Sequence, residues 1–305
     1  MPLNMKKSPV LVPVLLLLVA MLSIQSGASL AKTLFPVIGA QGMTALRLCL
    51  GTIILMAFLR PWRKNASRTP GPGARGWLVA YGLSLGGMNL MFYMALQTVP
   101  LGIAVALEFI GPLTVAMFSS RRVVDFLWIA LVIAGLALLL PLNQSVDGVD
   151  PVGAGYALGA GVFWALYIIF GQRAGENYGT RSVAFGAMIA TVIALPVGVM
   201  HAGTDLFSLA ILPTAIGVAI LSTALPYSLE MVALTRLPAQ TFGTLTSLEP
   251  AMGALSGLIF LNETLSLIQW LGLLAIIVAS MGASLTIRPK AKVRSVKKAQ
   301  ATAES

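Results

Sequence analysis

The stretch that decides the fold is TVPLGIAVALEFIGPLTVAMFSSRR, residues 98–122. It is an apolar run of helix length that holds one carboxylate, Glu108, and an internal proline, and it ends on two arginines. The same design returns in RLPAQTFGTLTSLEPAMGALSGLIFLNE, residues 236–263, where Glu249 is again set among apolar residues. Two such segments in one chain predict a duplicated membrane protein, because internal repeats are a common plan of transporters.

The composition is that of a membrane protein. Of the 305 residues, 57% are hydrophobic and only 10% are charged, whereas soluble domains carry about 25% charged residues. The apolar residues come in long blocks rather than alternating with polar ones, which predicts membrane-spanning helices. Since one span with its connection uses roughly 30 residues, the chain has room for about ten spans and none for a sizeable soluble domain.

The predicted fold class is an all-α integral membrane protein with about ten transmembrane helices. The first apolar run follows Lys6 and Lys7 and is longer than the apolar core of a secretory signal peptide, so we expect it to remain as the first helix. The predicted helices are 10–31, 37–59, 76–97, 101–119, 124–141, 152–171, 182–200, 209–229, 239–260 and 267–287.

The basic residues predict the orientation. With the N-terminus in the cytoplasm, nearly all Lys and Arg fall in cytoplasmic segments, while the opposite loops carry acidic residues such as Asp150 and Glu263. Because excess Lys and Arg marks cytoplasmic loops, both termini are expected inside, which requires an even number of helices. The basic residues behind the net charge of +10 are therefore expected to set the orientation of the protein in the membrane. Those of the basic tail, 288–305, are expected to contact lipid headgroups. No nucleic-acid partner is expected.

The two halves are predicted to be inverted repeats. Pro100 and Pro238 are 138 positions apart, and so are Pro112 and Pro250. The first five-helix repeat is expected at 10–141 and the second at 152–287. Five is an odd number of helices, so the halves insert in opposite orientations. Secondary transporters with inverted repeats bind their substrate near the midplane, between the repeats.

Polar side chains at helical spacing predict which helices face the substrate path, because polar groups in lipid turn towards protein or water. The fifth and tenth helices have almost none and are expected at the periphery, facing lipid or the second protomer of a homodimer. The alternative for the small and aromatic residues is helix packing. The candidate substrate-binding or coupling residues are Arg47, Asn89, Tyr93, Glu108, Trp164, Tyr167, Tyr227 and Glu249.

Three ionisable residues lie well inside predicted helices: Arg47, Glu108 and Glu249. Intramembrane charge costs a few kcal/mol or more unless it is paired or wetted. One interpretation is a structural ion pair between Arg47 and a carboxylate. The other is a polar binding site whose acids take an ammonium group or exchange protons. Lys32 and Glu230 lie near helix ends and are expected to reach the membrane interface.

Prolines inside the predicted helices free backbone carbonyls one turn earlier. Pro112, Pro226 and Pro250 are in this position. The resulting kinks are expected to present backbone groups to a ligand or to act as hinges; packing alone is the alternative.

The sequence contains no recognisable cluster of catalytic residues. Its one histidine, His201, is expected in a solvated loop at a helix end, and its one cysteine, Cys49, lies in an apolar block and is assigned to packing. No phosphate-binding loop and no metal-ligand spacing occurs. The chain is therefore predicted not to be an enzyme and to use no metal or cofactor.

Several segments resemble the EamA branch of the drug/metabolite transporter superfamily. They include SIQSGASLAK, TVPLGIAVALEF, GQRAG, STALPYSLEM and IFLNET, and together the similar segments cover residues 23–286. The resemblance implies ten helices, export of threonine, homoserine and related amino acids across the bacterial inner membrane, and drive from the proton gradient. It assigns no binding residues.

The leading hypothesis is a secondary exporter of small neutral amino acids. Glu108 or Glu249 would receive the ammonium group or a proton, and Arg47 or a broken-helix end would receive the carboxylate. Two alternatives remain open. One is an exporter or importer of another metabolite or drug, since a shared fold does not fix the substrate. The other is a non-transporting membrane accessory subunit.

Overall fold

The computed structural model describes residues 11–62, 71–118, 123–139, 150–179, 181–236 and 245–286. Within these ranges the regular structure is entirely helical. The longer α-helices are α1 (Leu11–Lys32), α2 (Phe35–Leu59), α3 (Ala74–Ala95), α4 (Leu101–Phe118), α5 (Val123–Leu139), α6 (Pro151–Tyr178), α7 (Arg181–Ala202), α9 (Leu225–Arg236), α11 (Glu249–Leu261) and α12 (Leu267–Thr286). Between α7 and α9 lie the 3₁₀ helix η1 (Gly203–Phe207), α8 (Leu212–Ala219) and the π-helical η2 (Ile220–Ala224).

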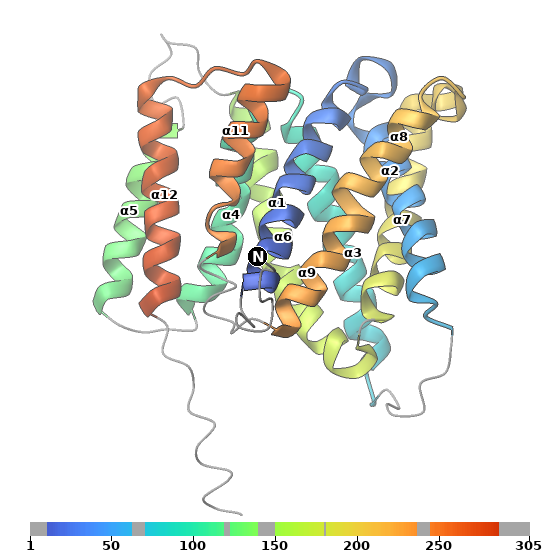
Figure 1. Ribbon diagram of the computed structural model, residues 1–305, viewed down its shortest axis with the longest axis horizontal. Helices are drawn as coiled ribbons and strands as arrows, with labels where there is room; N and C mark the ends of the chain where they lie inside the picture. Colours follow the sequence, from blue (N-terminus) through green and yellow to red (C-terminus); the bar gives the residue numbers. More distant parts are fainter. Residues whose placement is uncertain are drawn as a thin grey trace, which may run out of the picture.

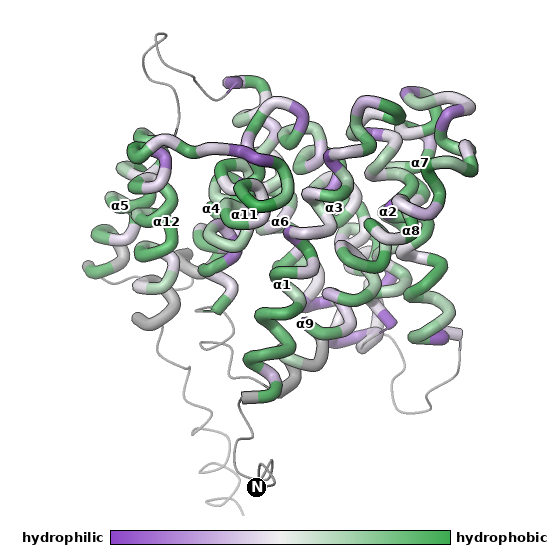
Figure 2. The backbone as a smooth tube through the Cα atoms, turned by 45° about the horizontal axis from the view of Figure 1, so that its top comes forward, coloured by the Kyte–Doolittle hydropathy of each residue, from purple (hydrophilic) through white to green (hydrophobic). Residues whose placement is uncertain are grey.

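Six helical segments of the described part are long and apolar enough to cross a bilayer, and four shorter apolar helices accompany them. Each of the ten predicted segments overlaps one of these. The surface is apolar along the helices: Ile53, Phe126 and Ile259, for example, are 60% or more exposed. Figure 2 shows hydrophobic residues along the helices and hydrophilic ones concentrated towards helix ends and connections. The chain is a multi-pass membrane protein.

The helices pack in pairs that bring together distant parts of the chain (Figure 1). α1 lies against α9, α2 against α7, α3 against α6, and α4 against α11. α5 and α12 pack on one another at one edge of the molecule. This confirms that the predicted fifth and tenth helices are peripheral.

The largest buried cluster of the described residues reaches one end of the bundle. The cluster gathers the last turn of α1, the first turns of α2 and the junction of α3 with α4, with Ala31, Ile38, Leu96 and Leu101 all at most 1% exposed. This is the end at which the chain passes from α1 to α2 and from α11 to α12 (Figure 1).

A close crossing of α4 and α6 sets the position of Glu108. A Cβ atom on Gly111 would overlap the carbonyl oxygen of Gly161, and one on Gly161 would lie 2.6 Å from the carbonyl oxygen of Glu108. Only glycine permits this approach of the two backbones. The internal proline, Pro112, cannot donate a hydrogen bond to the Glu108 carbonyl one turn earlier. α4 nevertheless continues through it to Phe118.

Three sequence-based expectations need correction. α6 runs to Tyr178 rather than to 171, because polar helix formers extend the helix beyond its apolar run. His201 lies in the last turn of α7 rather than in a loop, and its side chain is exposed. Glu249 is not near the middle of a continuous helix: it is the first residue of α11. Proline is favoured in the first turn of a helix and disfavours helical geometry before it, so Pro250 sets this start.

Candidate functional site

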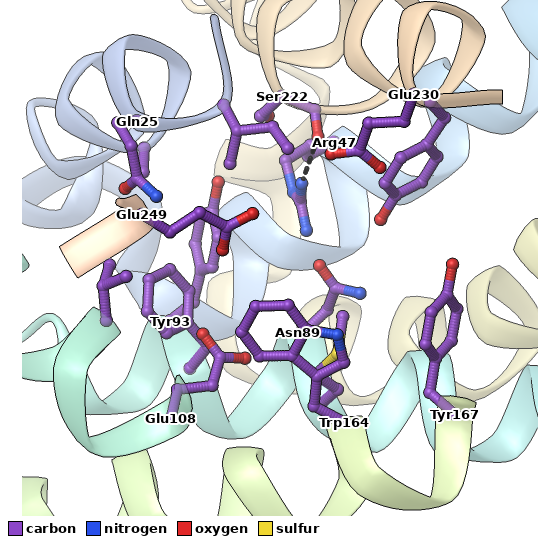
Figure 3. A pocket seen from close by; sticks show the side chains of 16 residues that line it. Gln25, Arg47, Asn89, Tyr93, Glu108, Trp164, Tyr167, Ser222, Glu230 and Glu249 are labelled. Atoms are coloured by element: carbon purple, nitrogen blue, oxygen red, sulfur yellow. Dashed lines mark hydrogen bonds between the residues drawn. The ribbon is translucent and has the colours of Figure 1, made fainter. Parts of the chain in front are cut away.

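A cavity of about 110 Å³ lies between α1, α2, α3, α4, α6, η2, α9 and α11 (Figure 3). A cavity of this size has room for several water molecules, which is the scale of a small amino acid. The structure brings all eight of the predicted site residues together around it. They are Arg47, Asn89, Tyr93, Glu108, Trp164, Tyr167, Tyr227 and Glu249.

Arg47 supplies the positive charge of the cavity. It lies midway along α2 and is 3% exposed. Its Nη1 donates to the carbonyl oxygen of Ser222 at 2.9 Å and to Thr223 Oγ1 at 3.3 Å. The guanidinium carbon lies 4.7 Å from the ring centroid of Tyr93, a cation–π contact. Its Nε and Nη2 are buried without a hydrogen-bond partner, so two donors of the fork remain available.

The structural ion pair considered for Arg47 is not formed. Among the described residues, no carboxylate lies within salt-bridge distance of the Arg47 guanidinium. A salt bridge does form elsewhere, between Lys32 and Glu263. The charge of Arg47 is therefore held by neutral partners: a carbonyl, a hydroxyl and an aromatic face.

The Ser222 carbonyl that binds Arg47 lies in a π-helical interruption just before α9. η2 is π-helical, with the Leu225 N–H bonded to the Ile220 carbonyl. Pro226 has no N–H for the Ser222 carbonyl, and the bond from the Leu225 N–H to Ile220 leaves the Leu221 carbonyl free, so carbonyls of this turn lack their usual intrahelical donors. Two of these bond to side chains of other helices: Ser23 Oγ donates to Leu221 O at 2.6 Å, and Arg47 to Ser222 O. The predicted effect of this proline on the backbone is confirmed.

Three carboxylates face the same cavity: Glu108 from α4, Glu230 from α9 and Glu249 from α11 (Figure 3). Glu108 and Glu249 are each 7% exposed. None of the three lies within salt-bridge distance of a described basic residue. The described chain contains no cluster of at least three Asp, Glu, His or Cys side chains arranged to hold a metal ion.

Glu230 was expected at the membrane interface, and that expectation is wrong. It lines the cavity together with Tyr227, three residues earlier on the same face of α9. The signal was present, because Tyr227 and Glu230 stand at helical spacing. Proximity to a helix end suggested the interface instead, but α9 continues past this residue to Arg236.

Sequence reasoning also missed Gln25. This α1 residue is 2% exposed and lines the cavity, and its Oε1 has no hydrogen-bond partner. The Tyr93 hydroxyl is likewise buried without a partner. Buried polar groups are almost always hydrogen-bonded, so such atoms around one cavity indicate a place for a polar ligand or water.

The remaining predicted residues form the polar and aromatic walls. Asn89 Nδ2 donates to Leu85 O at 2.7 Å, which fixes its amide on α3. Trp164 packs edge-on against Phe109 with ring centroids 5.6 Å apart. The Tyr167 hydroxyl lies 3.5 Å from that of Tyr81. These contacts hold α3, α4 and α6 around the charged groups.

Lys32 lies outside the cavity, as expected, but it is not merely interfacial. Its Nζ lies 2.5 Å from Glu263 Oε1, and Glu263 Oε2 accepts from the Leu101 N–H at 2.8 Å. The carboxylate thus joins the end of α1 to the start of α4, at the end of the bundle where α1 passes to α2.

Known proteins resemble this chain along nearly its full length. The model of the EamA-like transporter family matches residues 151–285. The threonine/homoserine exporter RhtA of Salmonella typhimurium strain LT2 is 60% identical over 296 residues, covering 97% of this chain and 99% of that protein. RhtA of Escherichia coli K12 is 58% identical over 294 residues, covering 96% and 98%.

A solved crystal structure of another protein shares the fold. It superposes with a TM-score of 0.60 at 20% sequence identity and covers 92% of this chain and 98% of its own. With the near-complete match to the RhtA proteins and the match to the family model, this chain belongs to the EamA-like transporter family.

Proposed function

We propose that this protein is a secondary active exporter of the small neutral amino acids threonine and homoserine, driven by the proton gradient across the bacterial inner membrane. Amino-acid export is supported by the relatives named as threonine/homoserine exporters, which match at 58–60% identity over almost the whole chain. A secondary transporter is further supported by a cavity near the middle of α2, α4 and α6 whose lining includes charged and polar side chains.

The observation that carries the proposal is the charge distribution of the cavity. An amino acid is a zwitterion, and its transfer into a low-dielectric site requires partners for both charges. Arg47 offers two unpaired donors in a planar fork, which matches the geometry of a carboxylate. Glu108 and Glu249 offer acceptors for the ammonium group from two other helices. In the proposal Arg47 binds the carboxylate, and one of these acids binds the ammonium group.

Proton coupling is supported by the excess of acids. Three carboxylates and one guanidinium line the cavity, and a zwitterion does not change their sum. Uncompensated buried charge is expensive, so such a site releases or takes up protons as its occupancy and solvation change. An acid that gives up its proton to one side and regains it from the other would link proton entry to substrate exit.

We also propose the inverted-repeat plan, with repeats at 10–141 and 152–287, a basic tail at 288–305 and both termini in the cytoplasm. The helix pairing supports it. If the five helices of each half are matched in order, the pair α3–α6 corresponds to α9–α1, and α4–α6 corresponds to α11–α1; all four pairs are in contact. The pairs α2–α7, α4–α11 and α5–α12 correspond to themselves.

The proposal is tested with the purified protein in liposomes. An imposed pH gradient, acid inside, should drive uptake of labelled threonine and homoserine through the molecules inserted inside-out, and a protonophore should abolish it. Labelled leucine and lysine serve as amino acids of other size and charge. If none of the labelled amino acids enters under any gradient, amino-acid export is excluded. Uptake at the same rate with and without the pH gradient would exclude proton coupling but not amino-acid export.

A further inference from the structure

We propose that Gln25 determines specificity by hydrogen-bonding the side-chain hydroxyl of the substrate. This inference rests on the proposed export of hydroxyl-bearing amino acids and adds a residue and a role to it. Gln25 is a cavity residue with an orphaned acceptor: its side chain is buried, and Oε1 has no partner. An unsatisfied buried carbonyl oxygen is destabilising, and a bound hydrogen-bond donor would relieve that cost.

The amide of Gln25 lies beside a glycine of the opposite helix. A Cβ atom on Gly253 of α11 would lie 3.5 Å from Gln25 Oε1. Gly253 is one helical turn after Glu249, so the amide of Gln25 lies beside the turn of α11 that begins with the carboxylate. Figure 3 shows Gln25 and Glu249 at the same end of the cavity, with Tyr167 at the other.

The chemistry of the amide matches a hydroxyl better than it matches either charge. Ammonium and carboxylate groups form their strongest hydrogen bonds with ionised partners, and the cavity supplies these in Glu108, Glu249 and Arg47. A carboxamide accepts through oxygen and donates through nitrogen, as a hydroxyl both donates and accepts. Once both charges are bound, the hydroxyl is the one polar group of threonine or homoserine that still needs a partner.

A site built around such a hydrogen bond discriminates strongly against analogues that lack the hydroxyl, because its own polar group is then left unpaired. Valine has the shape of threonine without the hydroxyl, and norvaline has that of homoserine. The amide of Gln25 sits on a flexible side chain, so it can follow the hydroxyl of threonine and that of homoserine, which is one carbon farther from the backbone.

The test is competition by unlabelled amino acids against labelled threonine transport in proteoliposomes. Gln25→Met keeps the length of the side chain and removes the amide. We expect it to reduce the ratio of threonine to valine affinity roughly five- to tenfold, the value of one lost hydrogen bond. Gln25→Asn retracts the amide, so it should favour homoserine over threonine relative to the wild type.

The matched control is Ser29→Ala. Ser29 is also a buried α1 residue with an unpartnered oxygen, but it does not line the cavity, so its loss should leave the affinity ratio unchanged. If Gln25 instead held the ammonium group, Gln25→Met would weaken threonine and valine equally, and an unchanged ratio overturns the inference.

Two further outcomes separate this inference from the proposed function. Wild-type protein that binds neither threonine nor homoserine would remove the proposed function itself. Should Gln25→Met fail to fold, the homoserine-to-threonine ratio of Gln25→Asn decides: a ratio equal to that of the wild type counts against a role in reading the hydroxyl.

Discussion

Arg47 Nη1 donates to the carbonyl oxygen of Ser222 at 2.9 Å, and Pro226, four residues after Ser222, cannot compete for that oxygen. In an uninterrupted α-helix, the N–H of residue 226 would bond to it. The missing N–H therefore lets one edge of the guanidinium dock on η2, while Nε and Nη2 stay unpaired. This arrangement orients Arg47 in the cavity without neutralising it.

Replacing this proline should loosen that anchor. In Pro226→Ala, the restored N–H competes with Arg47 for the Ser222 carbonyl, and the π-helical turn can relax towards an α-helix. We expect the threonine concentration for half-maximal transport to rise about three- to tenfold, as for partial loss of one hydrogen bond to a charged group. Pro196→Ala is the control, since Pro196 also lies inside a helix but is exposed. Equal effects of the two variants would contradict the anchoring role.

Arg47 itself should be required for binding but not for folding. Arg47→Lys keeps the charge and loses the planar fork, and Arg47→Gln loses both. Because no described carboxylate pairs with Arg47, neither variant strands a salt-bridge partner. We expect threonine affinity to fall at least tenfold in the first variant and further in the second, since hydrogen bonds to charged groups contribute about 1.5–3 kcal/mol. Labelled-threonine efflux and immunoblots of the membranes would measure transport and protein level; loss of folded protein would point to a structural role.

The two deeply buried acids should differ in role. Glu108→Gln and Glu249→Gln preserve shape while removing the proton-exchanging group. We expect one variant to lose threonine binding. The other should keep threonine exchange between the two sides of the membrane while losing its response to a pH gradient. Proteoliposomes assayed by counterflow and by gradient-driven uptake separate these properties. Wild-type behaviour of both variants in both assays would exclude the acids from the mechanism.

Much of the site could be predicted from the sequence because membrane burial makes polar residues informative. Ionisable residues such as Arg47 and Glu108 are energetically costly inside apolar membrane helices and are therefore rare there. The structure brings both to one cavity with Asn89 and Tyr227. That these residues bind substrate stays a prediction. Their shared location shows only that helices far apart in sequence direct polar groups to one place.

The features that were missed depend on backbone detail and on three-dimensional position. The π-helical η2 and the start of α11 at Glu249 arise from local geometry around prolines, which periodicity does not reveal. Glu230 was expected at the membrane interface because it follows directly on the predicted end of a helix, at residue 229. Gln25 was not singled out among neighbouring serines and glycines, because only the packing of α1 against α11 turns it into the cavity.

The junction between the end of α1 and the start of α4 should depend on more than its ion pair. Glu263 accepts from both Lys32 and the Leu101 N–H. Glu263→Ala therefore leaves the Leu101 N–H unpaired and removes the near partner of Lys32, which keeps its longer contact with the Val99 carbonyl at 3.5 Å. We expect destabilisation of about 1–3 kcal/mol, measured as a lower melting temperature in detergent. The exchange Lys32→Glu with Glu263→Lys restores opposite charges but leaves the Leu101 N–H without its acceptor. Complete recovery by the double variant would show that the ion pair alone matters.

The start of α6 provides a pH-dependent contact outside the membrane-spanning part. The Asp150 carboxylate accepts hydrogen bonds from the Thr98 hydroxyl at 2.8 Å and from the Gly153 N–H at 2.9 Å. These bonds hold the pKa of Asp150 below its ordinary value. A lowered pKa means that ionised Asp150 stabilises the fold above about pH 4 and that this contribution is lost as the pH falls through its folded-state pKa. Asp150→Ala should therefore lower the melting temperature at pH 7, with the difference from wild type shrinking below about pH 4.

The controls separate the charge of Asp150 from its capping geometry. Asn is also a good N-cap residue, so Asp150→Asn should retain most of the stability at pH 7 while losing the acid-dependent component. Asp205→Ala removes an exposed aspartate from η1 and should have the smaller effect. A melting-temperature difference between wild type and Asp150→Ala that persists unchanged to pH 3 would show that the contact acts through packing, because protonation would then remove nothing.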